Sequence, residues 1–404
     1  MANPNMKTRQ KPLYQLPLTI LLLAQLFTAL PIEGPLLGII WFAWIIFCSF
    51  YAFNICLERK TIQENTFAIV LLAFWILNVI SYFISPKYVS SFSLSVETLT
   101  YIKSITIALF SFFPFYYYSK HGVANSNLRP FIIFLLFTSA LRIILGNITQ
   151  SAETSEEHNV LNQAYLFAQI MPLILVCFRG RQVYLLIAIS ALFVLWGAKR
   201  GAILCMAVNV LIFFIYLLKE DSFGKKHRGR ILLLIVILLI IGVYFILGNE
   251  FLQGRLLSTG SEDDRSGEIR NEMYLILYNV FINNSTQSEL VFGRGLAQTV
   301  GIAENLAHQD WLELLIDNGI VGLALYVLLI LLCFKSAFKK TSYTPAAEKY
   351  ALICCVFDWC LTATYSMVYA SRDSFILFMS LGVILGSIRK AKKDRQEIFT
   401  TLHQ

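Results

Sequence analysis

Long uninterrupted apolar runs limit what this chain can fold into more than any other feature of its sequence. A helix needs about 20 mostly apolar residues to cross a membrane, and twelve runs approach or reach that length. Lipid satisfies no backbone hydrogen bonds, so only helices or closed barrels cross it, and no run shows the alternation of a barrel strand. Hydrophobic residues make up 57% of the chain and charged residues 14%, against about a quarter charged in a soluble domain. The sequence therefore predicts an all-α polytopic membrane protein.

Twelve membrane-spanning helices follow from these runs. The first is not expected to be a removable signal peptide, because further spans follow it directly and no small-residue cleavage site lies between them. The expected spans are 13–30, 35–57, 66–84, 97–118, 130–147, 160–178, 182–197, 201–218, 231–248, 318–334, 350–369 and 373–388.

Lysine and arginine are distributed unevenly between the two sides of this topology. Short cytoplasmic loops retain positive charge, so the N-terminal segment with Lys7, Arg9 and Lys11 is expected in the cytoplasm. Twelve crossings then assign 23 of the 33 cations to the cytoplasm and ten to the outer side, with both ends cytoplasmic. The net charge of +8 is thereby explained by topology, and no nucleic-acid partner is needed.

One connection between the expected spans is long. Residues 249–317 join the ninth and tenth spans on the outer face and hold eleven acids against four arginines. A loop of this length is usually functional. Apolar residues recur at helical spacing in 269–281 and 308–317, and Gly293 and Gly295 suit a turn or close approach to a ligand between them. The expected organisation is therefore spans one to nine in 1–248, a catalytic loop in 249–317, and spans ten to twelve with a basic tail in 318–404.

Several cations lie at span ends or inside spans despite the bias toward the cytoplasm. Lys103, Arg142 and Arg372 fit either long side chains that extend to the headgroups or a basic cavity for a phosphate-bearing ligand. Lys199 and Arg200 favour the cavity, because "GAKRGAIL" is a connector too short to do more than join two spans. The planar fork of arginine also matches two phosphate oxygens at once.

Asp358 and the cysteines are the reactive groups inside the spans. Asp358, in "CCVFDWCL", is the deepest acid and fits either a proton or ion relay or a member of a polar network between helices. All eight cysteines lie in apolar spans, so no disulfide framework or zinc spacing is indicated.

His308 differs from the other four histidines. Three of those are assigned to the cytoplasm, and His158 lies in a polar acidic loop. His308 sits where an amphipathic helix meets a span, and it fits either a hydrogen bond to the carboxylates around it or a catalytic role. Imidazole accepts a proton near neutral pH, so beside outward arginines it could deprotonate a hydroxyl while they hold an anionic leaving group.

Four stretches resemble the bacterial O-antigen ligase and O-antigen polymerase superfamily: "GAKRGAIL", "RSGEIRNEMY", "FGRGL" and "AHQDWLELLIDNGIVGL". They match, in order, an arginine followed by glycine or alanine at the start of a span, an arginine four residues before an aromatic, a Gly-x-Gly, and a histidine stretch ending in glycine. The resemblance covers about residues 190–330 in motif and the whole chain in topology. The order and spacing of the four carry more weight than any one of them.

The resemblance implies an inverting, metal-independent glycosyltransferase with a GT-C-like fold, no cofactor, and an active site at the periplasmic face of the inner membrane. His308 corresponds to the proposed general base, and Arg200 and Arg270 correspond to the arginines that hold the donor diphosphate. Arg294 and Arg142 are expected to assist them. Further support is expected from Lys199, Gln309, Asp310, Trp311 and Arg372. Gln309 departs from the asparagine usual in the family, so the positioning role of that asparagine does not transfer directly.

Two branches of the superfamily share this chemistry. A polymerase joins lipid-linked repeat units, and a ligase transfers the finished chain to the lipid A-core; the wording of "KRGAIL" and "HQDWLELL" favours the polymerase. Implied partners are an undecaprenyl-diphosphate-linked donor, a glycan acceptor, the membrane and a chain-length regulator protein. A flippase of lipid-linked sugars is the alternative from another class, although the sequence holds no internal repeats and this role leaves the long outer loop unexplained.

Overall fold

A computed structural model of the chain describes residues 11–30, 34–58, 65–91, 94–123, 125–154, 162–220, 225–229, 265–338 and 344–402. The predicted ninth span, 231–248, the first part of the long loop, 249–264, and His158 lie outside these residues.

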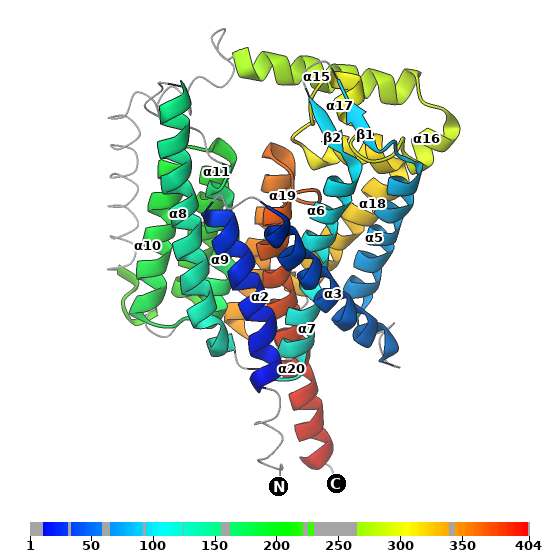
Figure 1. Cartoon of the computed structure of the whole chain (residues 1–404). Coiled ribbons are helices and arrows are strands. Elements are labelled where there is room, and N and C mark those ends of the chain that lie inside the picture. Colours follow the sequence, from blue (N-terminus) through cyan, green and yellow to red (C-terminus); the bar gives the residue numbers. More distant parts are fainter. Residues whose placement is uncertain are drawn as a thin grey trace.

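Helices dominate the described residues (Figure 1). A two-stranded antiparallel hairpin pairs β1 (Tyr88–Ser90) with β2 (Ser95–Glu97), and two short 3-10 turns are η1 (Asn125–Leu128) and η2 (Arg372–Ser374). The α-helices are α2 (Lys11–Ala29), α3 (Pro35–Leu57), α5 (Thr66–Ile84), α6 (Thr98–Phe110), α7 (Phe112–Lys120), α8 (Arg129–Thr154), α9 (Ala164–Cys177), α10 (Arg181–Trp196), α11 (Arg200–Lys219), α15 (Arg265–Asn283), α16 (Gln287–Phe292), α17 (Gln298–Ala303), α18 (Asp310–Phe338), α19 (Ala346–Tyr365) and α20 (Phe375–Leu402).

The protein is an all-α polytopic membrane protein. Seven helical segments of the described chain are long and apolar enough to cross a membrane, and α2, α9 and α10 contain shorter apolar helices. Twelve spans are therefore not confirmed, although eleven of the expected runs coincide with helices. The run at 97–118 differs from the expectation, because the α-helix is interrupted at Ser111 and continues as a second helix, α7.

Apolar side chains cover the outside of the bundle and polar ones are found within it. Large aromatic residues of α3 and α5 are exposed, among them Phe50 and Phe83. By contrast, Asn78 and Asn209 are fully buried. This inversion of the soluble pattern is what a lipid environment requires, because polar groups inside a membrane must find partners within the protein.

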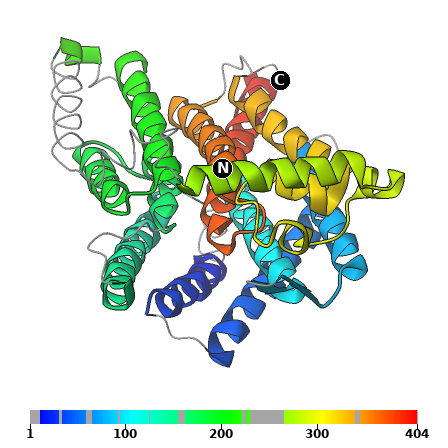
Figure 2. The same ribbon diagram turned by 90° about the horizontal axis from the view of Figure 1, so that it is seen from above.

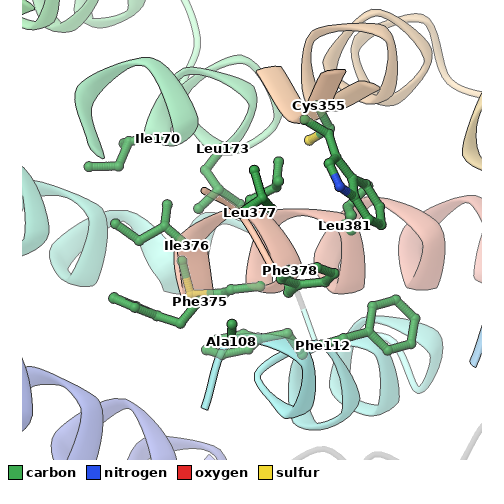
Figure 3. Packing of buried hydrophobic residues seen from close by; sticks show 14 of the residues in the cluster. Ala108, Phe112, Ile170, Leu173, Cys355, Phe375, Ile376, Leu377, Phe378 and Leu381 are labelled. Atoms are coloured by element: carbon green, nitrogen blue, oxygen red, sulfur yellow. The ribbon is translucent and has the colours of Figure 1, made fainter. Parts of the chain in front are cut away.

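Helix α20 passes through the centre of the bundle and packs on α7, α9 and α19 (Figure 3). Between helices in lipid, close packing takes over from the hydrophobic effect, and small residues allow the backbones to approach. Gly382 and Gly386, spaced as Gly-x-x-x-Gly, face α7, and a Cβ on Gly386 would lie 2.7 Å from the Tyr116 carbonyl oxygen. Phe375 and Phe378 are fully buried beside them, and the Phe378 ring packs edge-on against Trp359. The centre is therefore a rigid frame.

Helix α15 lies across one end of the bundle (Figures 1 and 2). Met273, Leu277 and Phe281 form its buried face, and they pack on Ala307 and Ile316. This confirms part of the expected amphipathic pattern, but Ile276 is exposed. We call this end, which also holds α16, α17 and the hairpin, the α15 end. The start of α2 and the tail of α20 lie at the opposite end (Figure 1).

The expected two amphipathic helices of the loop were too few. The described part holds α15, α16 and α17, and residues 310–317 form the first part of α18, which the non-helical Gly319 separates from the next span. Gly319, with φ 65° and ψ −166°, kinks α18 at the predicted boundary. Its missing side chain allows the backbone of Val291 to pass, just as Gly293, with φ 82°, allows the backbone of Asp317 to pass. Glycine at both positions is therefore required by close backbone contact as well as by φ.

Candidate functional site

His308 lies in the short segment between α17 and α18, at the α15 end. Its backbone has φ 50°, a left-handed conformation that is uncommon for residues other than glycine. Such strain persists only where the surroundings hold it, and it is concentrated at functional sites. The contacts on either side of His308 show what holds it.

Glu313 is the first of these contacts. Its Oε2 accepts a hydrogen bond of 2.7 Å from the backbone N–H of Ala307, the residue before His308. Its Oε1 accepts from the Thr299 hydroxyl of α17 at 2.6 Å and from the Tyr101 hydroxyl of α6 at 3.2 Å. A fully buried carboxylate is costly unless it is hydrogen-bonded, and Glu313 is bonded on both oxygens. It therefore fixes the His308 segment to two other helices.

Asp310 and Asp317 lie on the same side of α18, three residues before and four after Glu313. Asp317 accepts from the backbone N–H groups of Ala297 and Gln298 at 2.8 and 3.0 Å, which anchors the start of α17. Asp310 accepts from the Val368 N–H at 3.0 Å and from the Tyr326 hydroxyl. Each buried acid of α18 thus forms hydrogen bonds that hold a different segment around His308 in place.

A cavity of about 220 Å³ opens beside His308. Helix α9 contributes Tyr165 and Gln169, the end of α19 contributes Thr362, and η2 contributes Asp373. Segments far apart in the sequence thus meet at the imidazole. Polar groups predominate among these side chains, and the described residues that line the cavity include no lysine or arginine.

Two cations act on His308. Burial lowers the pKa of His308 below the ordinary 6.5, and the positive charges of Lys199 and Arg270 lower it further. Lys199 precedes the first residue of α11, whereas Arg270 lies on α15, where it also interacts electrostatically with Tyr274 and Tyr165. A lowered pKa leaves the imidazole neutral at physiological pH, the form that can accept a proton.

Arg200 is the first residue of α11 and follows Lys199 directly. The next residue, Gly201, explains the glycine of "GAKRGAIL", because a Cβ there would overlap the Tyr165 hydroxyl and lie 2.7 Å from the Cβ of Tyr365. The first turn of α11 therefore sits directly against the wall of the cavity. This brings the expected arginine motif to the same end of the molecule as His308.

Arg142 and Arg372 are engaged by other side chains. The two Nη atoms of Arg142 donate to the two carboxylate oxygens of Asp373 at 3.0 and 3.1 Å. Arg372 lies over the ring of Trp41, with 5.4 Å from its Cζ to the ring centroid. The expected phosphate-binding fork of Arg142 is thus occupied, and this arginine reaches the cavity through Asp373.

The expectation that Arg294 assists Arg270 at one diphosphate stays a prediction, and the contacts of Arg294 place it beyond the far end of α15. Arg294 donates to the Asn284 carbonyl at 2.7 Å and to the Ser285 hydroxyl at 3.1 Å, so it is anchored where α15 has ended. At about 1.5 Å per residue, Asn284 lies about 20 Å along the helix from Arg270. Its role is to join α15 to α16.

The remaining expected residues support the site or lie away from it. Trp311 donates to the Thr364 hydroxyl at 3.0 Å, and Gln309 has a buried Oε1 with no hydrogen-bond partner among the described residues. Asp358 accepts from Asn209 Nδ2 at 2.9 Å, and Asn209 also donates to the Ala168 carbonyl, which is the polar network expected as one alternative. Lys103 is exposed, in agreement with a headgroup-facing side chain.

Sequence reasoning missed Glu313, Asp317, Tyr165 and Gln169. A signal existed for the acids, because positions 310, 313 and 317 share one helix face by their spacing. Gln169 was a polar residue within an apolar run, one turn after Tyr165. In the described part of the chain, no three His, Cys, Asp or Glu side chains are grouped so as to hold a metal ion.

Residues 185–327 match a family model described as O-antigen ligase. The resemblance to the O-antigen polymerase and ligase superfamily is confirmed. The match covers about a third of the chain, from α10 into α18, and includes Lys199, Arg200, Arg270 and His308. A comparison with curated proteins found no match. Together with the membrane-spanning helices, the family match supports a multi-pass membrane protein of O-antigen synthesis.

Proposed function

We propose that this protein transfers a glycan from an undecaprenyl-diphosphate-linked donor to a sugar hydroxyl, with inversion at the anomeric carbon. The observation that carries the proposal is the position of His308, which has cations acting on it and a cavity lined by hydroxyl and amide groups beside it. A base between a cationic region and a polyol-binding cavity is what the reaction needs. The match to the O-antigen ligase family supports the same chemistry.

His308 acts as the general base. Burial and the charges of Lys199 and Arg270 lower its pKa, so the ring nitrogen is unprotonated at neutral pH. It takes the proton of the acceptor hydroxyl as the oxygen attacks the anomeric carbon. The bond from that carbon to the phosphate oxygen breaks, and the diphosphate leaves with the electron pair.

Arg200 and Arg270, with Lys199 beside them, stabilise the departing diphosphate. Cations fixed before the reaction begins lower the barrier, because they meet the developing negative charge without reorganisation. The positive charges of Lys199 and Arg270 serve twice, since together with burial they also keep the neighbouring imidazole neutral. We expect the transfer to proceed in excess chelator, with the cations supplying the charge stabilisation that a metal supplies elsewhere.

The acceptor divides the proposal into two branches. The motif wording favours a polymerase, whose acceptor is a second lipid-linked repeat unit. The description of the matched family favours a ligase, whose acceptor is the lipid A-core oligosaccharide. Supplying each acceptor separately with the same donor distinguishes them, because only one pairing yields a product.

The test uses the purified full-length protein in lipid nanodiscs, with both acceptors and mass spectrometry of the products. His308→Ala is expected to lower kcat by about a hundredfold to ten-thousandfold, the usual contribution of a general base. His121→Ala, directly after the last residue of α7, is the matched control and keeps the rate. Normal transfer by His308→Ala would contradict the base assignment. Failure of the wild type with both acceptors, with movement of the lipid-linked donor across a bilayer, would point to a flippase.

A further inference from the structure

Two buried polar side chains, Tyr165 and Gln169, line the cavity beside His308. Tyr165 is 5% exposed and Gln169 is 2% exposed, and both line the cavity. The Tyr165 hydroxyl and Gln169 Oε1 have no hydrogen-bond partner among the described residues. Buried polar groups are nearly always hydrogen-bonded, so a pair left open in a cavity indicates a site that a ligand completes.

The chemistry of these groups restricts the ligand. Gln169 Oε1 can only accept, so it needs an O–H or N–H donor, whereas the Tyr165 hydroxyl can donate or accept. Thr362, Ser366 and Ser371 add further hydroxyls to the lining. An array of acceptors and hydroxyls is suited to a neutral ligand with several hydroxyls of its own.

The charge of the cavity argues against a diphosphate there. Among the described residues that line the cavity, Asp373 is the one charged side chain apart from the titratable His308. Its carboxylate is already neutralised by Arg142. A phosphate would find no free cation in this lining. The charges that act on His308 come instead from Lys199 and Arg270, which are not part of it.

The size of the cavity sets the length of the ligand. Its volume of about 220 Å³ lies below the range of about 300–1,000 Å³ for pockets that enclose drug-sized ligands. One sugar ring fits this space better than a longer stretch of glycan. The rest of an acceptor chain would extend through the open side of the cavity.

We propose that this cavity is the acceptor subsite, which holds the terminal sugar of the acceptor with Gln169 Oε1 and the Tyr165 hydroxyl on two of its hydroxyls. A further hydroxyl of the same ring then faces His308. This inference rests on the proposed function. It adds the residues that choose the acceptor and separates them from those that hold the donor.

Steady-state kinetics with each substrate varied in turn test the assignment. Tyr165→Phe removes one O–H without changing the shape of the ring, and Gln169→Leu replaces the amide with an apolar side chain of similar length. Each variant is expected to raise the acceptor KM about tenfold, the effect of one lost hydrogen bond, and to leave the donor KM within twofold. Tyr278→Phe, an exposed tyrosine on α15, is the matched control and changes neither value.

Two acceptor arms, a lipid-linked repeat unit and a lipid A-core oligosaccharide, distinguish the sources of the sugar. The arm that the wild type uses is the one in which the acceptor KM rises. A raised donor KM with an unchanged acceptor KM would overturn the inference, and so would no change in either. If Gln169→Leu does not fold, Tyr165→Phe decides alone. Absence of transfer by the wild type would overturn the proposed function, whereas normal wild-type transfer with unaffected variants overturns only the acceptor subsite.

Discussion

Two regions meet at His308, and they are built from different parts of the molecule. Lys199 directly precedes α11 and Arg270 lies on α15, at the α15 end of the bundle. Tyr165 and Gln169 come from α9, which packs on α20, α19 and α11 within the frame of the bundle. The charged region is thus placed at the end of the bundle, whereas the neutral region is set into rigid helices. The difference matches what each must bind, a leaving group that changes its charge and a sugar that does not.

Substitutions in the charged region are expected to lower the rate of transfer more than any others except the substitution of His308. Arg270→Gln lowers kcat/KM about a hundredfold to thousandfold, because the leaving diphosphate loses a fixed positive charge. Arg200→Lys retains the positive charge but loses the bidentate contact with the phosphate oxygens, so kcat/KM falls less in this variant. Measurement of transfer at saturating acceptor checks both.

Two other arginines sharpen this result. Arg294→Gln is expected to lose at least tenfold less activity than Arg270→Gln, because its side chain is anchored about 20 Å away along α15. Arg181→Gln, exposed at the start of α10, keeps the wild-type rate. Equal losses in Arg294→Gln and Arg270→Gln would contradict the separation of the two residues.

Glu313→Gln is expected to lower kcat about tenfold, because the amide holds the Ala307 N–H less firmly and the ring of His308 loses its position. The matched control is Thr299→Val, which removes the hydrogen bond to the other carboxylate oxygen. Loss of that bond costs about 1 kcal/mol of stability, and kcat is retained. Thermal unfolding and transfer rates, measured on both variants, separate positioning from stability. A fall of kcat in Thr299→Val equal to that in Glu313→Gln would assign Glu313 a purely structural role.

Thr286→Ala is expected to have the smallest effect on transfer. Thr286 caps α16 by accepting from the Glu289 N–H at 3.3 Å, and the Glu289 carboxylate accepts from the Thr286 N–H at 2.7 Å. These bonds lower the pKa of Glu289, so their stabilisation is present above its usual pKa and is lost as the pH falls through the lowered value. The variant loses about 1 kcal/mol of local stability, measured by hydrogen exchange in α16, with normal transfer. Loss of transfer would link α16 to the chemistry.

The sequence was sufficient for features that depend on local pattern. Eleven of the expected apolar runs coincide with described helices, and the motifs named His308, Lys199 and Arg270, whose charges act on one another in the structure. Positive charge near His308 could be predicted, because glycosyl transfer from a diphosphate donor needs cations that stabilise the leaving group. The predicted boundary at 317–318 agrees with the structure, since the non-helical φ and ψ of Gly319 separate the amphipathic part of α18 from the span.

Features made by distant segments could not be read in advance. The cavity depends on how α9, α19 and η2 pack. The local sequence around Tyr165 and Gln169 does not specify that α19 and η2 lie beside them. The contacts of Arg294 could not be predicted for the same reason, because "FGRGL" marks a turn but does not fix where its arginine side chain points. Arg142 was expected to hold a phosphate, and its pairing with Asp373 spans most of the chain.

The pH dependence of kcat/KM in the wild type and in Lys199→Gln tests the central claim most directly. Burial and two cations lower the pKa of His308 and keep its imidazole neutral. In the wild type, kcat/KM is therefore expected to fall as the pH is lowered, with a midpoint below pH 6.5. Removal of the Lys199 charge raises the pKa of His308, so the midpoint moves to higher pH in Lys199→Gln. The same midpoint in both proteins, or an acid limb that persists unchanged in His308→Ala, would contradict the account.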